Sequence, residues 1–260
     1  MLTNMEIKKT TEIMNFSEIK SQNSMKKTSI RPSAKHIKAI LVEFAYLIVT
    51  SFGHIFKETT LQTNSMKSDD IPVLLVHGYM NNHFSWLNME KALKNRGYKG
   101  NIYTIKLKGP LNSIESFAKQ LADRIGEIVE KTGSEKVHLI GHSMGGLICY
   151  YYKNILDKEN IVSKIITIGS PLKGINRAKI SIGICGKQML PHSSLLARLN
   201  FNGDIPQYHF ASSSDQVVYP IFTSLINKPN HKNFLIKDVG HLSMLFNNEV
   251  SDTIYQCLAE

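Results

Sequence analysis

The chain has 260 residues, of which 42% are hydrophobic and 20% charged, and its formal net charge is +10. This length suffices for one large core, so we expect one domain over residues 71–260, preceded by an N-terminal region. The basic residues are dispersed without a zinc-finger, helix-turn-helix or RNP-like pattern, which argues against nucleic acid as a partner. The three cysteines are widely spaced, which argues against a disulfide framework and offers no metal-ligand pattern.

The N-terminal region divides into three parts by composition. Residues 1–35 are polar and lack periodicity, so we expect an extension without stable structure. Residues 36–56 are strongly apolar, with Glu43 as their only acid, and residues 57–70 form a polar linker. The apolar segment fits a membrane anchor, a helix lying on a membrane surface, or a helix packed on the domain. We predict that it contacts a membrane. The sequence does not decide between the cytoplasmic and the periplasmic side of that membrane.

An uninterrupted apolar run at residues 71–76 predicts a buried parallel strand. The loop His77-Gly78-Tyr79-Met80 follows the end of this strand. Ligands collect at the carboxyl ends of strands in open α/β sheets, and a glycine there permits close approach of the backbone. We therefore expect this loop to lie at the functional site.

Strands and helices then alternate along the chain. Residues 84–96 fit an amphipathic helix, and residues 101–107 fit a strand. Apolar residues recur at steps of three and four through residues 114–128, which predicts a long helix with Asn112 as its N-cap. Residues 161–168 predict a further strand. This alternation indicates an α/β fold with a mostly parallel central sheet and helices on both faces.

The most informative stretch is VHLIGHSMGGLICY at residues 137–150. It predicts a short buried strand, a sharp turn and an apolar helix that ends near residue 156. A serine hydroxyl becomes an effective nucleophile where it is held in a fixed position beside a base. A strained strand-to-helix turn provides such a position, and Gly141 and Gly145 remove side chains that would clash there. We predict Ser143 as the nucleophile, with His142 as part of the turn.

A nucleophilic serine needs donors that stabilise the oxyanion formed by its attack. In serine hydrolases of this architecture one backbone amide comes from the residue after the nucleophile and another from the loop after an early strand. This rule assigns the amides of Met144 and Tyr79. Each such donor contributes about 2.7–4 kcal/mol in related systems.

The base is sought among the histidines that follow the nucleophile, which are His192, His209, His231 and His241. His241 is the best candidate, because it lies on a short loop between a predicted strand at residues 234–237 and a helical segment at residues 242–258. Such a loop can bring the imidazole over the strand ends. His209 lies inside a predicted strand, so we expect a packed or surface residue.

The acid should fix the tautomer of the histidine and stabilise its protonated form. Asp215 follows the predicted strand at residues 208–211 through three serines, again at the carboxyl end of a strand. Asp204 precedes that strand, and Asp238 is close in sequence to His241, so both fit turn residues. We predict Ser143, Asp215 and His241 as a catalytic triad.

Residues 73–260 resemble the α/β-hydrolase superfamily, and within it the small bacterial triacylglycerol lipases and related esterases. Four segments carry this resemblance: VLLVHGYMNNHFSW from Val73, KVHLIGHSMGGL from Lys136, SSSDQVV from Ser212 and VGHLSMLF from Val239. They resemble the family's oxyanion loop, nucleophile elbow, acid loop and histidine segment. The resemblance implies the α/β-hydrolase fold and a bacterial enzyme. The apolar segment at residues 36–56 adds the expectation of an N-terminal helix and of membrane association, and the triad chemistry requires no metal or organic cofactor.

The same resemblance implies a serine carboxylic ester hydrolase, with a lipase acting on triacylglycerol or a related lipid ester as the first hypothesis. Phospholipases, thioesterases and acyltransferases fit the same triad, because the pocket walls and the lid determine the substrate. A non-catalytic binding protein with this fold is an alternative of another class.

Three features concern substrate access rather than the triad. Ser170-Pro171-Leu172 stands where relatives often have Thr-Pro-His, and no clear acidic cluster for calcium is present. Residues 172–189 offer the only room for a lid. This segment is basic and contains four isoleucines, which fits a partial lid, a lipid-contacting edge or a plain surface loop.

Overall fold

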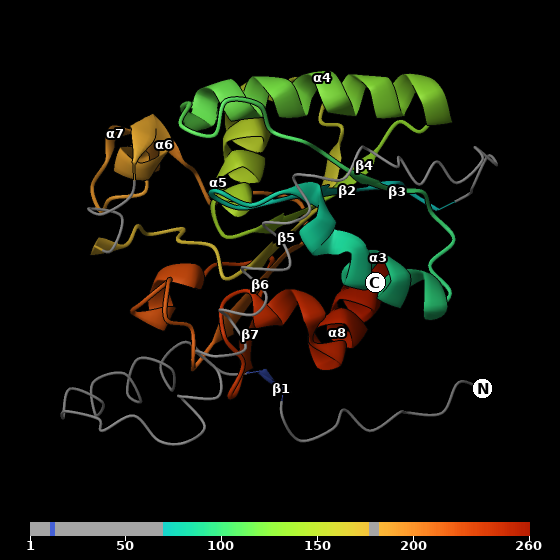
Figure 1. The fold of residues 1–260 in the computed structure, drawn as a ribbon. Helices are drawn as coiled ribbons and strands as arrows, with labels where there is room; N and C mark the ends of the chain where they lie inside the picture. The colour runs from blue at the N-terminus through green and yellow to red at the C-terminus, as the bar shows by residue number, and fades with distance from the viewer. Residues whose placement is uncertain (1–10, 14–69, 177–181) are drawn as a thin grey trace.

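The computed structural model describes residues 11–13, 70–176 and 182–260 (Figure 1). The predicted apolar helix at residues 36–56 lies outside these residues, as do nearly all of the predicted extension at residues 1–35 and the linker at residues 57–70. Among the residues that are described, no helix combines the length and the apolar character needed to cross a membrane.

One seven-stranded sheet forms the centre of the molecule, in the order β1-β7-β6-β5-β4-β2-β3. The strands are β1 (Thr11–Ile13), β2 (Val73–Val76), β3 (Ile102–Thr104), β4 (Val137–His142), β5 (Val162–Ile168), β6 (Gln207–Ser212) and β7 (His231–Ile236). All neighbours from β2 to β7 are parallel, which confirms the predicted mostly parallel sheet. The edge strand β1 is an unpredicted addition that pairs antiparallel with β7.

Helices cover both faces of this sheet, as predicted. They are α3 (Leu87–Asn95), α4 (Ile114–Thr132), α5 (Met144–Tyr151), α6 (Gly183–Gln188), α7 (Ser194–Arg198) and α8 (Asn248–Ala259). In Figure 1, α4 and α5 lie above the sheet, and α3 and α8 lie below it. The two larger apolar cores follow this division: Phe117 and Leu147 belong to one, and Trp86 and Ile254 to the other. With both faces covered, the strand ends are the places where reactive groups can gather.

The boundaries of α4 show why its amphipathic pattern forms a helix here. Its N-cap is Ser113, whose side chain accepts a hydrogen bond from the Ser116 amide at 3.2 Å, so the prediction of Asn112 as the cap is wrong by one residue. Gly133 ends the helix with a φ of 69°, a left-handed conformation that glycine adopts without steric cost.

Two other predicted helices begin later than expected. A 3-10 turn, His83–Trp86, precedes α3, and a second one, Ser243–Phe246, precedes α8. The Asn247 side chain caps α8 by accepting the Val250 amide at 3.0 Å. Because α8 starts only at Asn248, His241 lies on a loop and not within a helix.

Candidate active site

The predicted nucleophile Ser143 lies at the turn between β4 and α5. Its φ of 53° and ψ of −125° are strained for a residue with a side chain. The turn is also crowded, because a Cβ atom on Gly145 would lie 2.2 Å from the Val76 carbonyl oxygen, and one on Gly141 would lie 2.5 Å from the Gly146 nitrogen. The two glycines therefore allow the strained turn, and Ser143 retains an exposed fraction of 8%.

The structure brings the predicted acid and base into direct contact. His241 Nδ1 lies 2.7 Å from Asp215 Oδ2, although 26 residues separate them in the sequence. The other carboxylate oxygen, Asp215 Oδ1, accepts the amides of Val217 and Val218 at 2.8 Å each. Because an ionised carboxylate only accepts hydrogen bonds, Nδ1 carries the proton and Nε2 of His241 is left as the basic nitrogen.

His142 connects the nucleophile turn to the histidine loop. Its Nε2 atom lies 3.1 Å from the His241 carbonyl oxygen and donates a hydrogen bond to it, and the two imidazole rings lie 4.6 Å apart between their centroids. Gly169, at the end of β5, faces the same place: a Cβ atom there would lie 3.2 Å from both Asp215 Oδ2 and His241 Cε1. Ser143, Asp215 and His241 thus lie after the carboxyl ends of β4, β6 and β7, along one edge of the parallel sheet.

The loop after β2 approaches the nucleophile through its glycine. A Cβ atom on Gly78 would lie 2.8 Å from Ser143 Cβ. The Leu107 amide donates to His77 Nε2 at 3.3 Å, so His77 Nδ1 carries the proton and donates to the Gly78 carbonyl at 3.0 Å. In a trans peptide the C=O and the following N–H point in opposite directions, so this bond also fixes the direction of the Tyr79 amide.

The two predicted oxyanion donors remain available for a ligand. Neither the Tyr79 nor the Met144 amide has an acceptor among the residues that the structure describes. Met144 is the first residue of α5, where backbone amides have no partner within the helix. An anion near Ser143 would therefore meet unpaired N–H groups and the positive end of a helix dipole.

The electrostatic surroundings favour a neutral His142. Burial, and then the nearby charge of His241, lower the pKa of His142 well below its ordinary value. A neutral His142 does not repel the imidazolium that forms when His241 takes a proton. His142 can therefore support the histidine loop without opposing the charge that the proposed base acquires.

The hydrogen bond from His142 Nε2 to the His241 carbonyl leads to a prediction. Replacing it with Met is expected to slow the labelling of Ser143 by a serine-reactive phosphonate about tenfold, because a hydrogen bond of this kind is worth about 1–1.5 kcal/mol. His142→Gln keeps an N–H donor near the position of Nε2 and is expected to label at nearly the wild-type rate. Equal rates for the two variants, at equal melting temperatures, would assign His142 to packing alone.

Several candidates lie away from the three residues. His209 is buried in β6 and contacts Thr167 Oγ1 at 2.8 Å and His231 Nδ1 at 2.7 Å, as expected of a packed residue. Asp204 and Asp238 are exposed. No group of His, Cys, Asp and Glu side chains in the described ranges could hold a metal ion.

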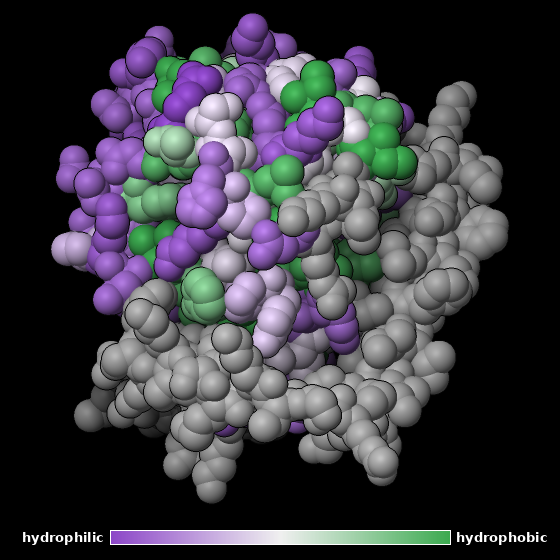
Figure 2. Space-filling view, turned by 90° about the vertical axis from the view of Figure 1, so that its left-hand side faces the viewer, coloured by the Kyte–Doolittle hydropathy of each residue, from purple (hydrophilic) through white to green (hydrophobic). Residues whose placement is uncertain are grey.

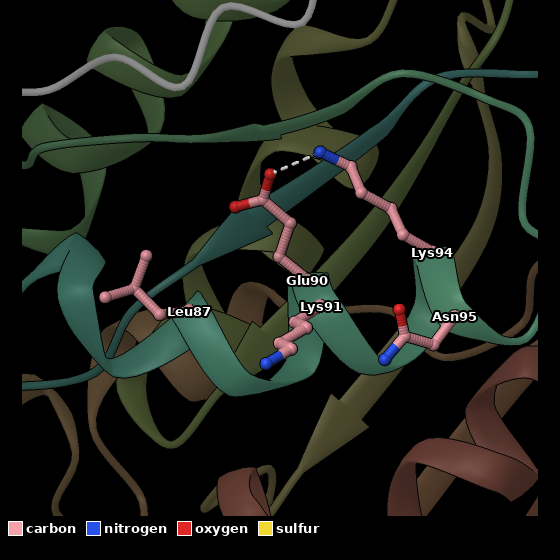
Figure 3. Close-up of a pocket in the computed structure, with 5 residues that line it drawn as sticks. All are labelled: Leu87, Glu90, Lys91, Lys94 and Asn95. Carbon is pink, nitrogen blue, oxygen red and sulfur yellow. Dashed lines mark hydrogen bonds and ion pairs between the residues drawn. The ribbon is translucent and has the colours of Figure 1, made fainter.

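A separate surface pocket lies on α3 (Figure 3). It is lined by Leu87, Glu90, Lys91, Lys94 and Asn95, all from this one helix. The Glu90 and Lys94 side chains form an ion pair at 2.8 Å. This pocket contains none of the predicted site residues, so we do not assign the chemistry to it.

The sequence indicates His142 as part of the nucleophile turn and His77 as part of the loop after β2, but not the contacts that they make. It does not single out Gly169. All three act through contacts between loops that are distant in the sequence. The His77-Gly78 pair does mark the loop, but its hydrogen bond to the Leu107 amide depends on the fold. No local signal distinguishes Gly169 from an ordinary turn glycine.

The comparisons with known proteins identify the family and the fold. The family model for palmitoyl protein thioesterase matches residues 72–250. The lysosomal thioesterase PPT2-B of Xenopus laevis is 32% identical over 106 residues, covering 40% of this chain and 36% of that protein. A triacylglycerol lipase of Burkholderia plantarii is 32% identical over 111 residues, which cover 40% of this chain and 30% of that protein. The matched segments thus span about a third of the length of these relatives.

The solved structures show the fold. Aspergillus fumigatus lipase B has a TM-score of 0.65 and 14% identity, covering 76% of this chain and 55% of that one. The mature Bacillus licheniformis lipase BlEst2 has a TM-score of 0.58 and 16% identity, and the match covers 78% of this chain and 96% of that one. These values confirm the predicted α/β-hydrolase fold for the part of the chain that the structure describes.

Proposed function

Because the chain belongs to the palmitoyl protein thioesterase family, we propose that it is a serine hydrolase of long-chain acyl esters. The buried contact between His241 and Asp215, at the sheet edge that also carries the strained Ser143 turn, is the observation that carries this proposal. A pair of this kind supplies a basic nitrogen at the sheet edge that carries the candidate nucleophile, and the family supports the class of substrate.

The proposed reaction proceeds through an acyl-enzyme. Ser143 Oγ attacks the acyl carbonyl carbon while His241 Nε2 takes the hydroxyl proton. Asp215 holds the His241 tautomer and stabilises the imidazolium, and the amides of Tyr79 and Met144 bind the oxyanion. The bond to the leaving group then breaks, and His241 returns the proton to the departing alcohol or thiol. Water, activated by His241, releases the fatty acid by the same steps.

Two leaving groups compete within this proposal. A lipid alcohol would make the protein a lipase, which the sequence resemblance and the triacylglycerol lipases among the relatives favour. A thiol would make it a thioesterase, which is favoured by the family match over residues 72–250. We propose the lipase first and the thioesterase as the second candidate. The predicted membrane contact of residues 36–56 stays a prediction.

The leaving group can be tested with matched substrates. We expect hydrolysis of p-nitrophenyl esters to increase at least tenfold from a butyryl to a palmitoyl chain, since each buried methylene adds about 0.8 kcal/mol until the pocket is filled. Comparison of kcat/KM for a palmitoyl oxygen ester and a palmitoyl thioester then separates the two candidates. If neither is cleaved and a phosphonate fails to label Ser143, a non-catalytic binding protein becomes the better hypothesis.

A further inference from the structure

Large apolar side chains are exposed on the loop after β2, on the loop before α4 and at the start of α6. Their exposed fractions are 61% for Met80, 44% for Leu111, 68% for Ile182 and 57% for Ile184. Met80 directly follows Tyr79, the residue whose amide we assign to the oxyanion. Single exposed apolar residues are ordinary on a protein surface, whereas a contiguous group marks a site of interaction.

Hydrogen bonds join the three segments that carry these side chains. The Tyr79 hydroxyl donates to the Ile182 carbonyl at 2.9 Å and accepts the Ile182 amide at 2.8 Å. The Ile184 amide donates to the Leu111 carbonyl at 3.0 Å. Met80, Leu111, Ile182 and Ile184 therefore share one part of the surface, which we call the apolar rim.

The charged residues on the three segments of the apolar rim are basic, and the nearby acid Glu115 accepts a hydrogen bond from Gln188 and lies 3.8 Å from the Arg198 guanidinium. Lys108 and Lys187 are exposed on the same segments. Residues 79–84, 106–112 and 182–188 contain no acidic residue. Near an anionic bilayer each lysine strengthens attachment roughly fivefold, and apolar side chains beside it enter the boundary between headgroups and acyl chains.

Figure 2 views the molecule from the side on which α6 and α7 lie in Figure 1. Apolar groups reach the surface there among hydrophilic ones. Together with the exposed Lys108 and Lys187, such apolar groups match the interface of an anionic membrane. A partner protein that bound through an apolar core would instead be expected to meet a surface depleted of lysine.

We propose that the apolar rim, together with Lys108 and Lys187, is a docking surface for an anionic phospholipid bilayer. This inference rests on the proposed function, because docking there would present Ser143 to acyl esters held in the membrane. It uses residues other than 36–56 and is independent of the prediction for that segment.

The test is sedimentation of the full-length Ser143→Ala protein with vesicles. One set of vesicles contains phosphatidylcholine alone, and the other also contains 30% phosphatidylglycerol, on the order of the charge of anionic membranes. We expect preferential binding to the anionic vesicles, and at least tenfold weaker binding after Lys108→Glu/Lys187→Glu or after Ile182→Ser/Ile184→Ser. Because Ser143 is absent, the assay gives an answer whatever the protein hydrolyses.

The control is Lys131→Glu/Lys158→Glu, which makes the same change of charge on exposed residues near the opposite ends of the strands. It is expected to bind within about twofold of the parent protein, because charges beyond a Debye length of about 10 Å from the membrane are screened. An equal loss in the control would show that overall charge, and not the apolar rim, determines binding. Unchanged binding of both rim variants, with melting temperatures equal to that of the parent, would also overturn the proposal.

Discussion

Replacing Ser143 with Ala is expected to reduce ester hydrolysis on the order of 10⁴- to 10⁶-fold, the range found when a triad nucleophile is removed. The loss is large because the reaction needs the Ser143 hydroxyl as its nucleophile, and the strained backbone of the turn fixes the direction of this side chain. His241 and Asp215 would remain in contact but would have no nucleophile to activate. The measurement is kcat/KM for the best acyl ester at neutral pH.

The matched control for this variant is Ser194→Ala, which removes an exposed hydroxyl from α7. It should keep the wild-type kcat/KM within about twofold, as ordinary surface substitutions do. Equal thermal unfolding of the two variants would show that the Ser143 effect is not a loss of fold. Residual activity of the Ser143→Ala protein above about one per cent would contradict the role proposed for Ser143.

The sheet and the nucleophile turn were open to prediction because their signals are local. Apolar runs of strand length that alternate with helical periodicity require a covered parallel sheet. The Ser143 turn needs glycine at Gly141 and Gly145, since any side chain there would collide with neighbouring backbone. Such steric demands appear directly as residue types at fixed spacing.

The supporting contacts could not be predicted because they depend on how distant loops meet. His142 and the His241 carbonyl are 99 residues apart, and no pattern around either residue indicates their hydrogen bond. The same holds for the Tyr79 hydroxyl and Ile182, which are 103 residues apart. The ends of helices were missed for a different reason: Asn112 and Ser113 are both good caps, and tertiary packing selects between them.

Replacing Asp215 with Asn is expected to lower kcat/KM about 10⁴-fold at neutral pH, the size of effect that this change has in a triad. The reason lies in the hydrogen bonds of the two carboxylate oxygens. If the Asn oxygen keeps the amides of Val217 and Val218, its NH₂ group faces His241 Nδ1. His241 Nδ1 must then accept a hydrogen bond from this NH₂ group, so the imidazole proton moves to Nε2. A protonated Nε2 can no longer take a proton from Ser143.

The other acids considered for this role provide the controls. Asp204→Asn and Asp238→Asn make the same chemical change on exposed residues, so each should retain kcat/KM within about threefold. Should Asp238→Asn match the loss expected of Asp215→Asn, the acid would have to be reassigned. The opposite amide orientation, with the Asn oxygen toward His241, would place the NH₂ group against two N–H donors. The Val217 and Val218 amides therefore enforce the inactive tautomer of His241. The effect of the substitution is expected to be large because both amides already donate to the side chain of residue 215 in the wild-type protein and so fix the orientation of the Asn amide.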